Sequence, residues 1–456
     1  MPGLRNQSKT FIYLLAFLSA SGYVFITYFL ERHETPALLS AYFIVFSCYL
    51  AILWKEGVFI KQETLDLKTF IYLAIILRLC LFFALPNLSD DFYRFIWDGR
   101  LLATGINPFA QLPTFYIEGS AESVPGITEE LFRNLNSPEY FTIYPPINQL
   151  IFWISAIIPG QSIFVAVLVM RFFILAAELG TIWLLPKVLQ QFNLPRNASL
   201  IYTLNPLVII EVTGNLHFEG MMVFFILLSL WWLNKEKLAL SASALAFAVG
   251  TKLIPLIFLP FLPRPLSLKK ISIYYSVCGL TILLLFLPLL SSELINGLQS
   301  SLSLYYQKFE FNASIYFILR EFGFWEFGYN RIEFIGKDLI NYTFWSIMIL
   351  AFWQWGKRPI LPTLFMFALG IYLLFSTTVH PWYVITLLAL SVFTNYRSPL
   401  LWTLVIFLTY SGYTISGFQL PTWVLYLEYG SVLAFFIFEL SRELGIIKLI
   451  RSKANG

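Results

Sequence analysis

Apolar segments separated by short polar stretches recur along the whole chain. The segments that can form membrane helices lie near residues 10–30, 38–54, 69–87, 163–186, 198–214, 217–233, 271–290, 338–355, 360–378, 380–394, 400–415 and 421–440. A straight membrane span needs about 20 residues, and several of these segments are shorter. We therefore expect some helices to be tilted, broken or extended by polar residues that face the protein interior. Two further segments, 145–158 and 238–263, are short or interrupted and could be re-entrant.

This pattern predicts an all-α fold, a polytopic transmembrane bundle of about 11–14 membrane helices in one domain. The domain covers residues 1–456. The first apolar run continues to Leu30, which favours an uncleaved first helix over a signal peptide. The composition agrees, because the chain is 58% hydrophobic and 12% charged, whereas soluble domains carry about 25% charged residues. We expect the lipid bilayer, and not nucleic acid, as a partner.

The positions of lysine and arginine predict the orientation of the chain. If the N-terminus lies inside, the loop 88–143 falls outside, and it holds eight acidic against three basic residues. If 145–158 only dips into the membrane and 238–263 forms a broken hairpin, every short basic loop lies inside. A single crossing by each of these segments would place four basic residues of the 187–237 block outside, so we favour the dip and the hairpin. Two long outer loops, 88–143 and 291–337, would then roof one extracytoplasmic cavity with amphipathic helices.

The first outer loop begins with a cluster of five charged residues, in SDDFYRFIWDGR at 89–100. Charges at a membrane boundary indicate a polar active site. Asp90 and Asp91 are adjacent, so they do not share a face, and one can meet a substrate while the other binds a base. Either is a candidate general base, since partial burial raises the pKa of a carboxylate. The alternative is that both stabilise a helix N-terminus.

Four basic or titratable residues are candidates to bind an anion such as a donor phosphate. Arg94 and Arg100 offer guanidinium groups, although either could instead pair with a nearby aspartate. Lys252 lies in an apolar stretch, where a lysine needs either a phosphate or a buried carboxylate; Gly250 and Pro255 predict a helix break around it. His380 opens the HPWY sequence at an outer boundary, and a structural role for it is equally open.

Five further polar residues on the outer side are weaker candidates for substrate binding. They are Tyr144, His217, Glu219, Asn312 and Tyr383. His217 and Glu219 follow a Gly-Asn turn, with Glu211 nearby, and this group could bind a substrate or a metal. The aromatic belt of a membrane protein also explains Tyr383. The chain has three histidines, and its three cysteines lie in apolar segments; neither set suggests a zinc site. A divalent metal near the acidic residues is compatible with the sequence, but no spacing requires a cofactor.

Five motifs together resemble a known family. They are DDFYRFIWDGR with GINPF (90–109), YPPINQ (144–149), NPLVIIEVTGNLHFEG (205–220), GTKLIPLIFLP (250–260) and HPWY (380–383). In this order they resemble membrane glycosyltransferases of the GT-C fold, and among these the bacterial polyprenol-phosphate-mannose-dependent mannosyltransferases. The resemblance implies a lipid-phosphate sugar donor bound on the outer face of the bacterial inner membrane. It also implies an acidic catalytic residue in the first outer loop, which corresponds to Asp90 or Asp91.

The residues suit such a reaction without the resemblance. A polyprenyl-phosphate donor needs a hydrophobic groove for its tail and cations for its phosphate, and the acceptor hydroxyl needs a base. Attack on the sugar would displace the phosphate with inversion, since retention would require a second carboxylate as nucleophile. The acceptor can be a glycan, a lipid or a protein, and mannose is implied only by the resemblance. A transporter or flippase of a polyprenyl-linked sugar is the competing hypothesis; inverted repeats would support it, and none is evident.

Overall fold

The computed structural model describes residues 2–60, 67–119, 123–158, 160, 162–291, 293–295, 297, 308–353 and 360–445. Regular structure within these residues is helical except for one small hairpin, in which β1 (Tyr413–Thr414) pairs antiparallel with β2 (Gly417–Phe418). The prediction of an all-α fold is confirmed. The basic residues at 61, 357, 358, 448, 451 and 453, which the expected topology used, lie outside the described residues.

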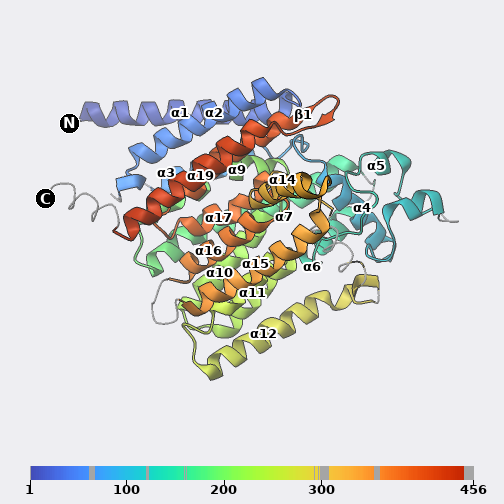
Figure 1. The fold of residues 1–456 in the computed structure, drawn as a ribbon. Helices are drawn as coiled ribbons and strands as arrows, with labels where there is room; N and C mark the ends of the chain where they lie inside the picture. The colour runs from blue at the N-terminus through green and yellow to red at the C-terminus, as the bar shows by residue number, and fades with distance from the viewer. Residues whose placement is uncertain are drawn as a thin grey trace.

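Most helices run roughly along one common direction and form the bundle (Figure 1). They are α1 (Pro2–Phe29), α2 (Thr35–Lys55), α3 (Leu67–Leu79), α7 (Ile163–Gln191), α8 (Leu200–Thr203), α9 (Pro206–Val208), α10 (Glu219–Asn234), α11 (Leu238–Thr251), α12 (Leu268–Phe286), α15 (Ile332–Trp353), α16 (Leu361–Phe375), α17 (Val384–Ser391), α18 (Ser398–Val405) and α19 (Thr422–Glu443). Short 3₁₀ or π segments join or extend them: η1 (Val58–Ile60), η3 (Arg196–Ser199), η4 (Ile209–Gly214), η5 (Ile254–Phe261), η6 (Leu287–Leu289), η7 (Pro381–Tyr383) and η8 (Ile406–Gly412).

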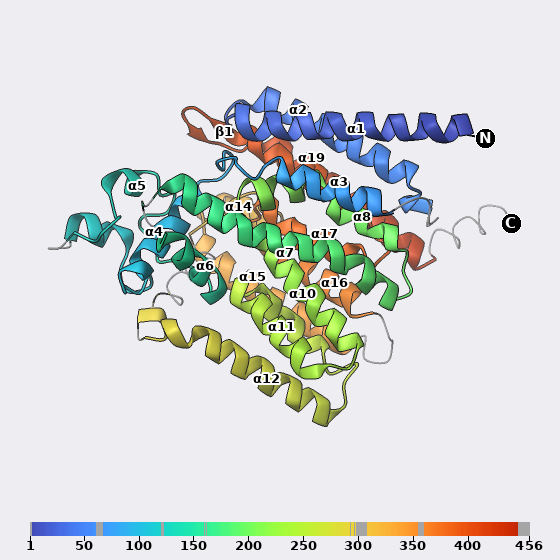
Figure 2. The ribbon, with the colours of Figure 1, turned by 180° about the vertical axis from the view of Figure 1, so that it is seen from behind.

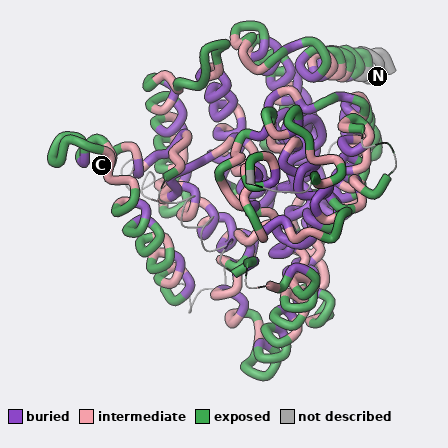
Figure 3. Tube along the Cα trace, turned by 90° about the vertical axis from the view of Figure 1, so that its right-hand side faces the viewer, coloured by how far each residue is buried: buried purple, intermediate pink, exposed green. Residues whose placement is uncertain are grey.

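The bundle is that of an integral membrane protein with several spans. Among the described residues, five helices are long and apolar enough to cross a membrane, or six if the bent pair Pro206–Gly214 and Glu219–Asn234 counts as one span. The count is lower than the expected 11–14 or so, because several apolar segments form helices of only 10–17 residues, such as Leu361–Phe375 and Ser398–Gly412. Helix α12 exposes apolar side chains such as Leu283 and Leu284. The exposed positions of the chain lie mostly at its periphery (Figure 3).

The two ambiguous apolar segments do not cross the bundle. Helix α11 leads to Lys252, and η5 returns, so that Glu236 before the hairpin and Lys270 after it form an ion pair at 3.5 Å. Helix α6 (Pro146–Ala156) has only 11 residues, too few for a span. Its end lies beside Arg100 and Ser162 around a small shared cavity. That residues 145–158 dip into the membrane and return stays a prediction.

The elements of the outer loops gather at one end of the bundle, opposite the start of α1 and the end of α19 (Figures 1 and 2). Besides α6 they are α4 (Asp91–Ala103), η2 (Phe115–Gly119), α5 (Glu129–Arg133) and α14 (Ile315–Phe327). Phe311 in the second outer loop forms a parallel bridge with Thr378, just before the HPWY sequence. Segments far apart in the sequence are thus brought together at this end.

Helix α4 packs directly on α6 through Gly99. A Cβ atom at position 99 would lie 2.3 Å from the backbone carbonyl oxygen of Phe152, and backbone cannot move aside cheaply. We expect Gly99→Ala to push α4 away from α6 and to lower the free energy of unfolding by about 1–3 kcal/mol. Thermal unfolding of the detergent-solubilised protein measures this. Gly430→Ala in α19 is the control, because a Cβ there meets nothing within 4 Å. Equal unfolding temperatures for the two variants would contradict the close contact.

Candidate functional site

The HPWY sequence lies at the centre of the candidate site. Two of its rings, those of His380 and Trp382, belong to a stack of five rings that we call the ring column. In order, the stack consists of Phe418, Phe311, His380, Trp382 and His217. The centroids of His217 and Trp382 are 3.7 Å apart, and those of His380 and Trp382 are 4.5 Å apart with nearly parallel planes. The column joins the β-hairpin, the second outer loop, η7 and the turn before α10. Four sequence regions therefore meet at one place.

Lys252 is paired with a buried carboxylate, that of Glu219. Helix α11 ends at Thr251 and η5 begins at Ile254, so the expected break is confirmed, and Lys252 between them is extended. Its ammonium group forms an ion pair with Glu219 at the start of α10, and it lies 4.0 Å from the centroid of the Tyr383 ring. The Lys252 side chain is 27% exposed and that of Glu219 is 5% exposed. The Lys252 side chain is therefore partly accessible, whereas its carboxylate partner is buried.

The imidazole of His217 lies next to a second buried carboxylate, that of Glu211. Its Nε2 atom is 3.4 Å from an Oε atom of Glu211, whose other carboxylate oxygen accepts a 2.6 Å hydrogen bond from Tyr410. The residue before it, Leu216, is buried at φ +63°, a left-handed conformation that costs free energy for a residue with a Cβ. The strained turn holds the imidazole against Trp382.

Asp90 and Asp91 have different partners, as expected for adjacent residues that do not share a face. Asp90 forms an ion pair with Arg32 at 2.5 Å, and Arg32 also lies over the ring of Tyr413 in β1. Asp91 opens α4, accepts a 2.6 Å hydrogen bond from Asn136, and is partly exposed. Burial raises the pKa of Asp91, while the positive charges of His217 and Lys252 and the Asn136 hydrogen bond oppose the rise. Asp91 therefore lies within the field of the Lys252 and His217 groups.

His380 differs in charge from Lys252. Burial, together with the charges of His217 and Lys252, lowers the pKa of His380 to about 3. The ring is consequently neutral near pH 7, and it can donate one hydrogen bond but adds no positive charge. Its role toward a phosphate stays a prediction.

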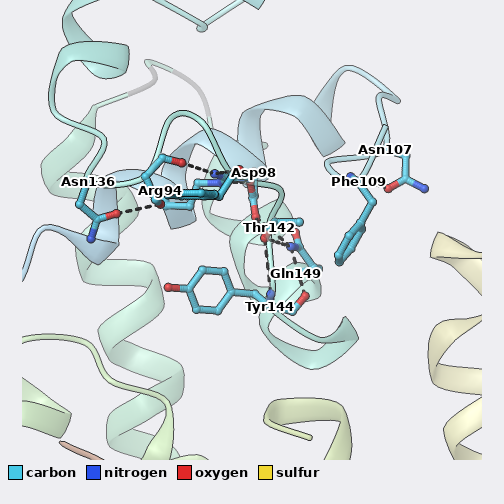
Figure 4. A network of polar contacts seen from close by, with 10 residues as sticks. Arg94, Asp98, Asn107, Phe109, Asn136, Thr142, Tyr144 and Gln149 are labelled. Atoms are coloured by element: carbon cyan, nitrogen blue, oxygen red, sulfur yellow. Dashed lines mark hydrogen bonds and ion pairs between the residues drawn. The ribbon is translucent and has the colours of Figure 1, made fainter. Parts of the chain in front are cut away.

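Arg94 and Asp98 form a buried polar network beneath the loop that carries Asn136 (Figure 4). Arg94 donates to Asp98 at 2.9 Å and to the carbonyl oxygens of Ser137 and Tyr140. Asp98 also accepts hydrogen bonds from Gln149, at 2.9 Å, and from Thr142. The network fixes the chain that follows Asn136, so that Arg94 supports the loop whose Asn136 contacts Asp91.

The remaining candidates lie farther from the charged cluster. Arg100 donates to the carbonyl oxygen of Gly126 near the far end of α4. The ring of Tyr144 packs on Phe95 and Phe152. Asn312 is fully buried, at φ +44°, and donates to Glu428 of α19. Asn312 therefore supports the second outer loop beneath the ring column, and the substrate-binding and phosphate-binding roles of these three residues stay predictions.

Sequence reasoning passed over residues that position the site. Arg171 in α7 is fully buried and donates to the carbonyl oxygens of Thr213 and Gly214 at 2.8 and 2.9 Å. It also donates to the carbonyl oxygens of Phe82 and Ala84, in the chain that leads to Asp90. A charge inside the apolar run 163–186 was the available signal, and it is the same signal that singled out Lys252. Arg32 and Asn136 gave no comparable signal.

Metal binding has no support in the geometry of the described part of the chain. There, no group of three or more His, Cys, Asp and Glu side chains is arranged to hold a metal ion.

Comparison with known proteins places these residues in a family. Residues 18–264 match the family model described as "Alpha-(1->6)-mannopyranosyltransferase, N-terminal domain", which covers more than half of the chain. The chain belongs to this family. The matched range includes Asp91, His217, Glu219 and Lys252.

Two curated relatives carry the name alpha-(1->6)-mannopyranosyltransferase A. The protein of Corynebacterium glutamicum is 27% identical over 185 residues, which are 40% of this chain and 35% of the relative. The protein of Mycobacterium tuberculosis is 24% identical over 202 residues, which are 44% of this chain and 36% of the relative. The chain therefore spans about a third of the length of the curated relatives that it matches.

The first outer loop holds two ion pairs of the same spacing that differ in burial. Arg94–Asp98 is buried, whereas the side chains of Arg133 and Glu129 are 75% and 71% exposed. We expect Asp98→Ala to lower the free energy of unfolding by about 3–5 kcal/mol, because it leaves a buried guanidinium without its partner. We expect Glu129→Ala to leave the unfolding temperature almost unchanged. Thermal unfolding of both variants decides this, and similar losses in the two would show that the Asp98 network does not hold the loop.

Proposed function

We propose that this protein is a membrane mannosyltransferase that uses a polyprenyl-phosphate-mannose donor on the outer face of the bacterial inner membrane. The family supports the sugar and the reaction class, and the names of the relatives suggest an α-(1→6) linkage. The observation that carries the proposal is the partly exposed Asp91 within the field of Lys252 and His217. The acceptor is a glycan, a lipid or a protein with a free hydroxyl group.

Asp91 is the general base in the proposed reaction. The acceptor hydroxyl gives its proton to Asp91 while its oxygen bonds to the anomeric carbon of mannose. The bond between that carbon and the phosphate oxygen breaks, its electron pair stays with the phosphate, and the configuration inverts. The phosphate gains one negative charge, which Lys252 and His217 stabilise. Asp90 supports the site indirectly, because its carboxylate is held by Arg32.

An apolar groove supports a lipid donor. Leu256, Leu259 and Pro260 of η5 form one wall, and Tyr275, Cys278, Gly279 and Ile282 of α12, with Met348 of α15, form the other. The groove has a volume of about 480 Å³ and is open to the outside. Because η5 begins two residues after Lys252, a phosphate at Lys252 would leave its polyprenyl tail close to this groove. We assign the groove to the donor tail.

Replacing one aspartate should abolish transfer, whereas replacing its neighbour should not. We expect Asp91→Asn to lower kcat for mannose transfer at least roughly 100-fold, because it removes the base. Asp90→Asn, the matched control, should lower kcat by less than about tenfold, because it only weakens the contact with Arg32. The assay uses purified protein in nanodiscs, synthetic polyprenyl-phosphate-mannose and a panel of acceptors. Normal transfer by Asp91→Asn would refute the base assignment, and donor translocation without any transfer would favour a flippase.

The pH dependence of transfer should report the raised pKa of Asp91. The carboxylate is active only when ionised, so kcat/KM should fall as the pH drops through this pKa, which lies above the ordinary value of 3.8. Residual transfer by Asp91→Asn should lack this acidic limb. A pH–rate profile between pH 4 and 8 or so measures both variants. An acidic limb at the ordinary carboxylate value, or one that persists in Asp91→Asn, would argue that another group is the base.

A further inference from the structure

Glu211 is a buried carboxylate for which the proposed reaction has no direct use. It lies in the π-helical segment η4 and has no exposed surface. One oxygen accepts the 2.6 Å hydrogen bond from Tyr410, and the other faces Nε2 of His217 at 3.4 Å and the side-chain amide of Asn215 at 3.4 Å. Tyr410 comes from η8, far along the chain, so the carboxylate is held from behind by a second element. Its second oxygen lies next to two side chains, of which His217 is the titratable one.

The backbone around His217 favours the same contact. The amide nitrogen of His217 donates to the carbonyl oxygen of Glu211 at 3.1 Å. The left-handed Leu216 between them closes this turn at a cost in free energy. Trp382 of η7 stacks on the imidazole. The imidazole is therefore held in a fixed place, with its Nε2 atom 3.4 Å from a carboxylate oxygen.

Charged and titratable groups surround His217 on every element packed against it. Besides Glu211 and Tyr410 they are Asp91 of α4, Arg171 of α7, Glu219 of α10, Lys252 after α11, and His380 before η7. Glu219 is already paired with Lys252, and Arg171 is bound to backbone carbonyls. Glu211 is the carboxylate in direct contact with the imidazole.

We propose that Glu211 is a positioning residue that holds His217 in its charged, imidazolium form, so that His217 and Lys252 together bind the phosphate of the donor. A carboxylate next to an imidazole favours its protonated state. The imidazolium would supply positive charge that the site otherwise lacks, because His380 is neutral and the carboxylate of Glu219 neutralises Lys252. This inference rests on the proposed function for the identity of the phosphate ligand, but the link between Glu211 and the charge of His217 stands independently of transfer.

The first test follows the charge of His217 directly. With three histidines in the chain, histidine ring signals from ¹³C-labelled protein in nanodiscs can be assigned with His33→Asn and His380→Asn. In Glu211→Gln the His217 signal should change with pH at a lower midpoint than in the unaltered protein. Glu428→Gln, which removes another buried carboxylate that contacts Trp402 and Asn312, should leave the midpoint unchanged. An unchanged midpoint in Glu211→Gln overturns the inference, whether or not the protein transfers mannose.

The second test measures binding of a short-chain polyprenyl phosphate without any transfer. At neutral pH, Glu211→Gln should bind it roughly tenfold more weakly than the unaltered protein, the effect of losing one nearby charge. The difference should disappear at pH values low enough to charge His217 in both proteins, whereas Glu211→Asp should bind normally at neutral pH. A loss that persists at low pH would show a merely structural role and overturn the inference. If binding follows this pattern but no acceptor receives mannose, the proposed function fails while the Glu211–His217 link stands.

Discussion

The guanidinium group of Arg171 is the interaction on which the outer site depends. It binds backbone carbonyls at the end of η4 and, from the same position, carbonyls of the chain that leads to Asp90. A helix that breaks inside a membrane leaves carbonyl groups without partners, and each costs several kcal/mol unless another group satisfies it. The bend of 111° between Pro206–Gly214 and Glu219–Asn234 is such a break. By satisfying these carbonyls, Arg171 fixes His217 and Glu219 relative to Asp91.

Because the protein interior is apolar, its buried charged side chains are paired with other polar groups. Arg78 pairs with Glu178, which also accepts a hydrogen bond from Tyr202, and Glu211 accepts one from Tyr410. These groups are buried and their contacts hold helices together. The Lys252–Glu219 pair differs, because the Lys252 side chain remains about a quarter exposed. Exposure therefore separates the charges that support the fold from those that can meet an anionic ligand.

The sequence predicted the fold class and much of the site, because periodic apolar runs and isolated charges are local signals. It predicted that Asp90 and Asp91 would take different partners and that the chain would break near Lys252. It could not choose which aspartate faces the site, because Arg32 and Asn136 come from other segments. It left Arg94 open between a phosphate and a nearby aspartate, because its actual partners, Asp98 and the carbonyls of Ser137 and Tyr140, are set by tertiary packing. Contacts between distant segments leave no periodic trace in one sequence.

The most direct measurement is a cryo-electron microscopy structure of the protein in nanodiscs with bound polyprenyl phosphate. We expect the phosphate between Lys252 and His217, the tail in the groove lined by Leu256, Leu259 and Cys278, and the Asp91 carboxylate facing the open side of the phosphate. A phosphate bound at Arg100, or at any place out of reach of Lys252, would contradict the assignment of the donor site. It would also remove the reason to regard Asp91 as the base.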